Sequence, residues 1–279
     1  MNLTAILANF SFLILYVVLF FLSKWIKGMF ASYVLDEQLT EYDNNAVSVS
    51  VAGYFIGITA VFVGAMSGPS AGDVVTDLIS VASYSLAGIL LLNLARIINS
   101  RLILYKFNVD KEIIKDQNPG TGVVEAGAYI ASGLIIAGAI HGEGGGPLTA
   151  LVFYIIGQIC LILFSLLYAR MSPYDVHAEI EKDNTAAGLG FAGALISIGI
   201  IVMKGVSGDF TGWAEDLMAL GIDIAIIFVY LIVVRLVFDR FVLRNSSLHE
   251  EISEDQNMGA GLLEMMVAIC FSAALFFVL

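Results

Sequence analysis

The sequence predicts an all-α polytopic membrane helical bundle with eight transmembrane helices in two parallel four-helix repeats. Of the 279 residues, 59% are hydrophobic and only 14% are charged, whereas a soluble domain carries about 25% charged residues. The hydrophobic residues form blocks of about 20, long enough to cross the bilayer core as helices. Gly and Ala are frequent in these blocks and period-two alternation is absent, which argues against a membrane β-barrel.

Eight apolar blocks predict the helices, because a backbone in lipid must satisfy its own hydrogen bonds. In chain order the blocks cover residues 5–23, 46–66, 75–98, 119–140, 148–169, 185–203, 216–238 and 258–278. The first block has no basic residue before it and no evident cleavage site after it. We therefore expect a first membrane helix here and not a usual signal peptide.

Basic residues follow the first, third, fifth and seventh predicted helices. Twelve of the thirteen Lys and Arg lie in or beside these loops, and only Lys204 lies on the opposite side. By the positive-inside rule, the side of the membrane with these basic loops is cytoplasmic. We therefore expect the N-terminus and the C-terminus both outside. Trp25 and Trp213, near the ends of their helices, suit the membrane interface.

The second, fourth, sixth and eighth predicted helices begin after an acidic segment that ends in asparagine. Asparagine is a favourable N-cap, because its side chain accepts an unsatisfied amide of the first turn. Pro119, directly after Asn118, suits the first helical position. The repeated cytoplasmic motif comprises Asp43, Asn44, Asp116, Asn118, Asp183, Asn184, Asp255 and Asn257. Gly, Ala and Ser are common in these four helices and allow close packing in lipid, so we expect them to form an inner ring.

The motif segments reveal an internal duplication. "EIIKDQNPGTGVVE" (112–125) and "EISEDQNMGAGLLE" (251–264) are identical at eight of fourteen positions, with a constant offset of 139 residues. The duplication predicts two domains, a four-helix membrane repeat A at 1–142 and a repeat B at 147–279. The Gly- and Pro-containing "HGEGGGP" at 141–147 is typical of a linker turn. Weaker copies of the motif divide each half again, and all four units point the same way.

Tandem four-helix halves with Asp-x-Asn or Asp-Asn before a Gly/Ala-rich helix resemble the domain-of-unknown-function 350 family, the YjfL-like bacterial inner-membrane proteins. "KDQNPGTGVVEAG" and "EDQNMGAGLLE" are the clearest matches, and the copy at 36–53 is the loosest. The resemblance covers essentially the whole chain as two copies. It implies a multi-pass protein of the bacterial inner (cytoplasmic) membrane and gene neighbourhoods concerned with envelope or membrane stress. It implies no activity.

Two carboxylates lie inside the predicted membrane helices. Glu125 and Glu264 each follow the capping asparagine by seven residues, which places them about 10 Å into the membrane. Arg96 and Arg235 lie about one turn inside the same side. A charge at this depth costs several kcal/mol unless it is paired, hydrated or able to snorkel. The economical interpretation is two ion pairs, Arg96–Glu125 and Arg235–Glu264, or their exchange across the halves.

The other interpretation makes this candidate intramembrane charge site part of a cation or proton path, because buried acids often mark such routes. Asp223 adds a third acid, where the first half has Tyr84. Asn93 and Gln158 are more typical of interhelical hydrogen bonds than of ligands.

Composition and motifs disfavour several classes of function. The net charge of −12 argues against a nucleic-acid partner. The three histidines are scattered over loops, and no Cys/His cluster has zinc spacing. "DQNPGT" lacks the ligand spacing of a calcium loop. We therefore expect no metal and no cofactor, and with no catalytic constellation visible we expect no enzyme.

Two functions remain. The first is a scaffold or component of an envelope or membrane-stress system, in which the mixed-charge cytoplasmic segments bind a soluble partner. The alternative is a channel or transporter for a cation, a proton or a small solute, with Glu125 and Glu264 in its path. The sequence favours the scaffold by a small margin. The lipid bilayer is a partner in either case, and a homo-oligomer is compatible with the small-residue faces.

Overall fold

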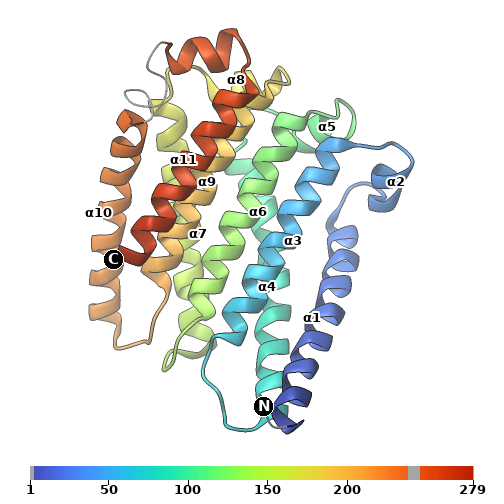
Figure 1. The fold of residues 1–279 in the computed structure, drawn as a ribbon, viewed down its shortest axis with the longest axis vertical. Helices are drawn as coiled ribbons and strands as arrows, with labels where there is room; N and C mark the ends of the chain where they lie inside the picture. The colour runs from blue at the N-terminus through green and yellow to red at the C-terminus, as the bar shows by residue number, and fades with distance from the viewer. Residues whose placement is uncertain (1–2, 238–245, 279) are drawn as a thin grey trace.

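The computed structural model describes residues 3–237 and 246–278 (Figure 1). These residues contain eight helices long and apolar enough to cross a membrane, and no strand. The eight are α1 (Leu3–Phe30), α3 (Asn45–Met66), α4 (Val74–Leu102), α6 (Pro119–Ile140), α7 (Gly146–Met171), α9 (Thr185–Val206), α10 (Trp213–Val237) and α11 (Met258–Val278). The predicted all-α class and the eight helices of membrane-spanning length are confirmed.

Four short helical segments lie together at one end of the long helices. They are α2 (Leu35–Thr40), α5 (Val109–Ile114), α8 (Val176–Glu181) and the single π-helical turn η2 (Glu250–Glu254). We call this end the motif face. At the opposite end, the terminal face, α1 begins and α11 ends (Figure 1). Sequence analysis did not predict the short segments, because five or six residues are too few for a helical periodicity to be recognised.

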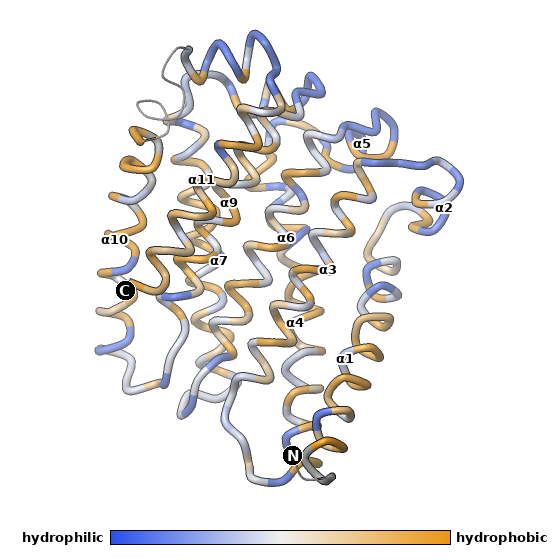
Figure 2. Tube along the Cα trace, viewed as in Figure 1, coloured by the Kyte–Doolittle hydropathy of each residue, from blue (hydrophilic) through white to orange (hydrophobic). Residues whose placement is uncertain are grey.

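The distribution of hydropathy along the chain supports a membrane position for the long helices. Apolar residues dominate their middle portions, and polar residues gather at the motif face and in the loops of the terminal face (Figure 2). The surface of α1 is apolar, with large exposed side chains such as Leu7, Ile14 and Phe21. Such a surface is favourable in hydrocarbon and unfavourable in water. The coarse prediction of a multi-pass membrane protein is therefore supported.

The long helices form two layers. In the first layer, α3, α6, α9 and α11 lie side by side in a parallel row, each packed on the next. In the second layer, α4 packs on α3 and α6, α7 packs on α6 and α9, and α10 packs on α9. Helix α1 completes this layer against α4 and α3. Each helix of the row begins after an asparagine at the motif face, so the four run in the same direction.

The row corrects the expectation of an inner ring. Helices α6 and α9, in the middle, have 72% and 78% of their central spans buried, whereas α11 has only 22%. Helices α3 and α11 stand at opposite ends, separated by α6 and α9 (Figure 1). The expectation was wrong for α11 because each helix of the row has at most two neighbours within it, and the last has one.

Glycines nine residues after the asparagine face the next helix of the row. A β-carbon at Gly127 would lie 2.8 Å from the Cα of Ala192 in α9, closer than packed atoms approach. Gly53 and Gly193 face the next helix with the same closeness. The equivalent residue of α11 is Met266, which is 44% exposed because no further helix follows. The one departure from the glycine pattern therefore marks the end of the row.

Glycines four residues after the asparagine face the previous helix. A β-carbon at Gly188 would lie 2.8 Å from the Cα of Gly120. Gly122 and Gly261 occupy the same position in their helices and approach the previous helix equally closely. The equivalent residue of α3 is Ser48, at the start of the row, where no previous helix requires a glycine. At each end of the row, the sequence therefore lacks the glycine that would face a further helix.

Candidate functional site

The four repeated motif segments share one backbone conformation. The residue before each asparagine has a positive φ: 47° at Asp43, 52° at Gln117, 64° at Asp183 and 49° at Gln256. Non-glycine residues rarely adopt this left-handed region, and aspartate does so more readily than most. This left-handed residue reverses the direction of the chain, so that each asparagine lies at the start of the next long helix. Asp43 and Asp183 therefore have a conformational role.

The asparagines cap the helices of the row, as the sequence predicts. Asn44, Asn118 and Asn184 each accept a hydrogen bond from the backbone amide three residues later. The Oδ1 of Asn257 accepts from the amides of Gly259 and Ala260, at 2.9 and 3.3 Å. All four motif segments therefore satisfy first-turn amides in the same way.

Three of these asparagines also join one motif segment to the next, and we call them the asparagine relay. The Nδ2 of Asn44 donates to the carbonyl of Ile113 at 2.9 Å. Asn118 and Asn184 donate to the equivalent carbonyls, those of Ile180 and Ile252, at 2.7 Å each. All three relay asparagines are 0% exposed. The relay runs along the motif face in the order of the row.

Each asparagine also binds a side chain of its own segment. The partners are Gln38 for Asn44, Glu112 for Asn118, Glu179 for Asn184 and Glu251 for Asn257, at 2.7 to 3.1 Å. Sequence analysis missed these partners. The signal was present, since a Gln or Glu precedes every motif asparagine by five or six residues.

The motif aspartates lie on the surface. Asp43, Asp116, Asp183 and Asp255 are all exposed. The ammonium of Lys111 donates to Asp116 at 2.8 Å, and this hydrogen bond lowers the pKa of the Asp116 carboxyl. The motif therefore divides into asparagines that hold the structure, three of them buried, and exposed acids that face the medium.

The structure brings Arg96 and Glu125 together inside the first half. The Nε of Arg96 lies 2.7 Å from Oε1 of Glu125, which is 4% exposed. Ser50 Oγ donates to the other carboxylate oxygen of Glu125, and Arg96 Nη2 donates to Asp110 in α5. The carboxylate in α6 is therefore compensated by groups from α3 and α4, as a buried charge requires.

A buried lysine that sequence analysis assigned only to orientation lies in the same region. The Nζ of Lys27, 4% exposed, donates to the hydroxyl of Tyr129 at 2.8 Å. It also lies 4.3 Å from the ring centroid of Tyr129 and 5.0 Å from that of Tyr54, a favourable cation–π geometry. No spacing in the sequence pairs α1 with α6, so only the tertiary structure reveals this contact.

In the second half, the described contacts of the equivalent carboxylate involve other residues. Glu264, 8% exposed, accepts a hydrogen bond from the hydroxyl of Tyr168 in α7 at 2.7 Å. The position of Ser50 is taken by Gly190, where an added β-carbon would lie closer to a carboxylate oxygen of Glu264 than packed atoms approach. The side chain of Arg235 lies outside the described part of the structure, so the second ion pair stays a prediction. The two carboxylates have equivalent depths, and the described partner of Glu264 differs from those of Glu125.

Asp223 does not join either carboxylate. It is half-buried in α10 beside Gly205, near the terminal face, whereas Glu264 lies within two turns of the motif face. The third predicted acid is therefore a separate feature.

Polar side chains between the layers form a closed triangle of hydrogen bonds. Asn99 donates to Ser132 at 3.1 Å, Ser132 to Gln158 at 3.2 Å, and Gln158 to Asn99 at 2.6 Å. All three are buried and come from α4, α6 and α7. Asn93 donates to the hydroxyl of Tyr54 at 3.1 Å. These contacts match the interhelical role that the sequence indicates for Asn93 and Gln158.

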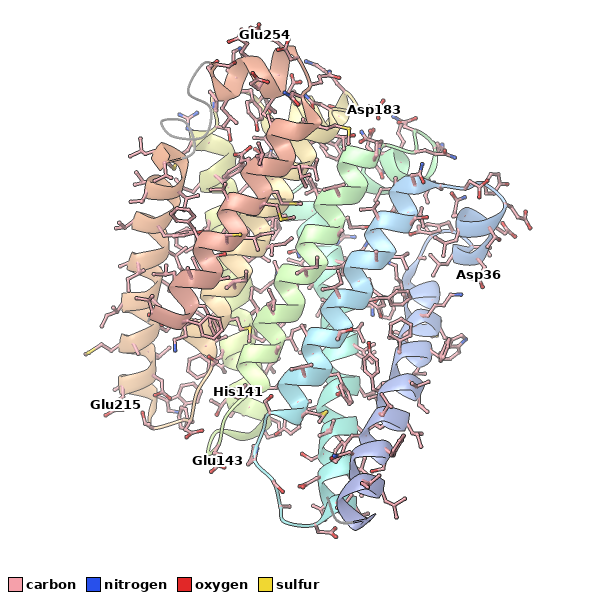
Figure 3. All side chains as sticks on the ribbon, viewed as in Figure 1. Asp36, His141, Glu143, Asp183, Glu215 and Glu254 are labelled. Atoms are coloured by element: carbon pink, nitrogen blue, oxygen red, sulfur yellow. The ribbon has the colours of Figure 1, made fainter. Side chains whose placement is uncertain are left out.

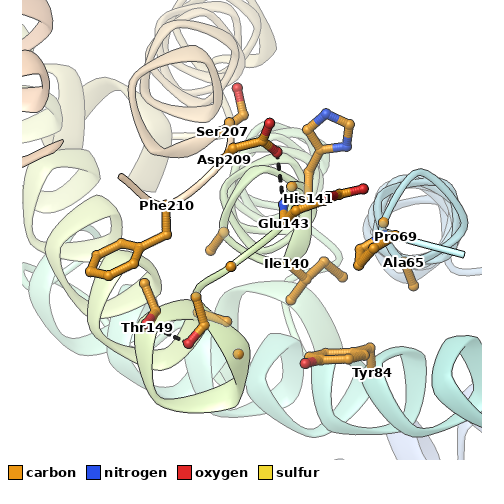
Figure 4. A pocket seen from close by; sticks show the side chains of 18 of the residues that line it. Ala65, Pro69, Tyr84, Ile140, His141, Glu143, Thr149, Ser207, Asp209 and Phe210 are labelled. Carbon is orange, nitrogen blue, oxygen red and sulfur yellow. Dashed lines mark hydrogen bonds between the residues drawn. The ribbon is translucent and has the colours of Figure 1, made fainter. Parts of the chain in front are cut away.

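A cavity of about 470 Å³ opens at the terminal face (Figure 4). His141, Asp77, Asp209 and Asp216 line it together with apolar ends of the long helices. The acids are bound within the loops: Asp77 and Asp216 accept from hydroxyls and amides of their own loops. Asp209 accepts from the amide of Glu143 at 2.8 Å. Among the described residues, no group of three or more His, Cys, Asp and Glu side chains is placed to hold a metal ion.

Comparisons with known proteins agree with this architecture. The family model described as Domain of Unknown Function (DUF350) matches the chain twice, at residues 1–140 and 144–279. The chain is also similar to a UPF0719 transmembrane protein of Aquifex aeolicus (strain VF5), with 24% identity over 233 residues, which covers 82% of this chain and 84% of the relative. No solved structure gives a significant match.

Proposed function

The chain belongs to the DUF350 family, whose name assigns no activity, and we propose that it is a non-catalytic membrane scaffold. In this proposal the motif face recruits a soluble partner in an envelope or membrane-stress system. In this proposal the motif face is the cytoplasmic side of the bacterial inner membrane, because the sequence assigns twelve of the thirteen Lys and Arg to the loops of that side and the positive-inside rule applies to them.

The observation that carries the proposal is the asparagine relay. Three buried side chains, Asn44, Asn118 and Asn184, tie each motif segment to the next by a hydrogen bond of 2.7 to 2.9 Å. A row of loops without such bonds would be free to move separately. The relay holds the four segments in a fixed order and spacing, which suits a surface that must match a partner.

The chemistry of the motif face indicates the kind of partner. Asp36, Asp183 and Glu254, from three different segments, all project at this face (Figure 3). Its exposed acids are Asp36, Glu37, Glu41, Asp43, Asp116, Asp175, Glu181, Asp183, Glu250, Glu254 and Asp255. Complementary charge favours association and specificity. A soluble partner with a basic surface fits this face best.

The alternative function is transport through Glu125 and Glu264. The space beside Glu125 argues for a structural role, since its cavity measures only about 10 Å³, enough for about one water molecule. The carboxylate is also engaged by Arg96 and Ser50. A conducting state would need these groups to separate.

Two measurements on the purified full-length protein separate the functions. We expect Asp116→Lys/Asp255→Lys to weaken capture of a soluble partner about tenfold while the melting temperature is kept. The matched control is Glu143→Lys/Glu215→Lys, the same charge change at the terminal face, which should leave capture unchanged. Equal capture by wild type and the motif-face variant would contradict the proposal.

The second measurement is ion and proton flux in proteoliposomes. The scaffold proposal expects no flux above that of empty liposomes, with either the wild type or a folded Glu125→Gln/Glu264→Gln variant. Flux in the wild type that disappears in the variant would replace the scaffold proposal with the transport alternative.

A further inference from the structure

A groove on the motif face carries charge opposite to that of the whole chain. It lies where the ends of α4 and α7 meet the segments before α5 and α8, and it measures about 720 Å³. Arg101, Lys106 and Arg170 line it, with Asp175 as the one carboxylate. The chain as a whole has a net charge of −12. A cationic groove in so acidic a protein is not explained by a face that recruits a basic partner.

The two arginines of this groove are available for a ligand. Arg101 and Arg170 are both exposed, and among the described residues neither has an ion pair or a side-chain hydrogen bond. Lys106 differs, because its Nζ donates to Asp175 at 2.7 Å. Asp175 in turn accepts from the amide of Ala178 at the start of α8. The acid is therefore occupied by the fold, and within the described part of the chain no carboxylate pairs with the two guanidinium groups.

Buried contacts join the walls of the groove. The Nε2 of His177, 2% exposed, lies 2.7 Å from the carbonyl oxygen of Ile103. The Tyr105 ring packs on the imidazole with centroids 4.9 Å apart. Burial lowers the pKa of His177, so the imidazole is neutral at pH 7 and adds no further charge. The contact ties α8 to the end of α4 beside the groove.

The groove becomes apolar toward the membrane. Arg101 and Arg170 lie in the last turns of α4 and α7, at the level where spanning helices meet the headgroups. Leu102 lines the groove at the level of Arg101, and Leu166 lines it one turn deeper than Arg170. Leu163, about one turn deeper again on α7, is 61% exposed. Guanidinium groups bind phosphate oxygens through paired N–H donors, and exposed leucines suit an acyl chain.

We propose that the groove between α4 and α7 binds one anionic phospholipid, with its phosphate on Arg101 and Arg170 and an acyl chain along Leu166 and Leu163. Basic pockets between membrane helices are suited to anionic headgroups. The bound lipid would neutralise the two guanidinium groups and fill the junction between the two halves of the chain. Free inorganic phosphate shares the headgroup chemistry and lacks the acyl chain, so the two sources can be distinguished.

The test is native mass spectrometry of the full-length protein in detergent, titrated with phosphatidylglycerol or phosphatidylcholine. We expect phosphatidylglycerol to bind as one tight adduct and phosphatidylcholine to bind weakly. Arg101→Gln/Arg170→Gln should weaken the phosphatidylglycerol adduct about 30-fold, since each cationic side chain near the headgroups contributes about fivefold, or about 1 kcal/mol. Lys111→Gln/Lys115→Gln removes two charges from the same face outside the groove and should keep the adduct.

Three results would overturn the proposal: equal adducts in wild type and the arginine variant, equal loss in the lysine control, or no preference between the two lipids. Inorganic phosphate at about 10 mM that displaces the lipid completely would reassign the groove to a soluble anion, because an acyl chain adds about 0.8 kcal/mol for each buried methylene. If the arginine variant does not fold, the salt dependence of lipid binding by the wild type tests the proposal instead. The phosphatidylglycerol adduct of the wild type must weaken as the salt concentration rises from about 0.05 to about 0.5 M, because the Debye length shortens and the attraction between the arginines and the phosphate is screened.

Discussion

The substitution Asn118→Ala tests whether the asparagine relay contributes more than helix capping. Asn118 is 0% exposed and makes three hydrogen bonds. Loss of an N-cap costs about 1 kcal/mol, and each buried group deprived of its partner costs about 1 to 3 kcal/mol. The Ile180 carbonyl keeps a second donor, the amide of Asp183, and Glu112 keeps Lys111 at 3.5 Å. The lower end therefore applies to both, for a total of about 3 kcal/mol.

The matched control is Asn257→Ala, the same change in the last motif segment. Asn257 is exposed and has no following segment to bind. The change removes the cap and the exposed hydrogen bond to Glu251, which water can replace, so we expect a loss of about 1 kcal/mol, that of the cap. The assay is denaturant unfolding of both variants in detergent micelles, followed by circular dichroism. Equal losses within about 0.5 kcal/mol would refute the relay. Asn118→Asp keeps the capping oxygen but replaces the Nδ2 donor by a carboxylate oxygen that faces Glu112 and the Ile180 carbonyl. This repulsion offsets the kept cap, so we expect the variant to be no more stable than Asn118→Ala.

Three further predictions follow from the described contacts. Gly127→Val should cost at least about 1 to 3 kcal/mol by overpacking against Ala192, while Met266→Gly at the open end should change the melting temperature little. A double-mutant cycle of Arg96→Gln and Glu125→Gln should give a coupling energy of about 1 to 3 kcal/mol in unfolding measurements, and additive losses would contradict the buried pair. Because burial lowers the pKa of His177, the unfolded chain takes up a proton near pH 6.5 that the folded chain resists. The His177 contribution is therefore complete above about pH 6.5 and is lost as pH falls, so unfolding at a series of pH values should show a flatter acid dependence for His177→Gln.

Local physical rules account for much of what sequence analysis predicted correctly. Apolar blocks of spanning length become helices because a backbone in lipid has no other donors or acceptors. Asn44, Asn118 and Asn184 cap those helices because capping involves residues only three positions apart. The depth of Glu125 follows from the helical rise counted from Asn118. Each of these predictions depends on neighbours along the chain.

Pairings between distant segments were less accessible. Arg96 and Glu125 could be matched because both had to be compensated at one depth, and the structure places them 2.7 Å apart. Lys27 carried no such signal, since a lysine after a first helix is what orientation requires. Its contact with Tyr129 crosses 102 positions of sequence, and no periodicity encodes it.

The sequence by itself determined the long helices, where they start, the shared direction of the four helices of the row, and the duplication. These features depend on burial in lipid and on hydrogen bonds between near neighbours. It also contained the ends of the row, as Ser48 and Met266 in place of glycine, but their meaning needed the neighbours. Only the tertiary structure decided that the small-residue helices form an open row and not a ring. A glycine permits close approach of a helix but does not specify which helix approaches. The identity of the neighbour depends on how all eight long helices of the described chain pack together.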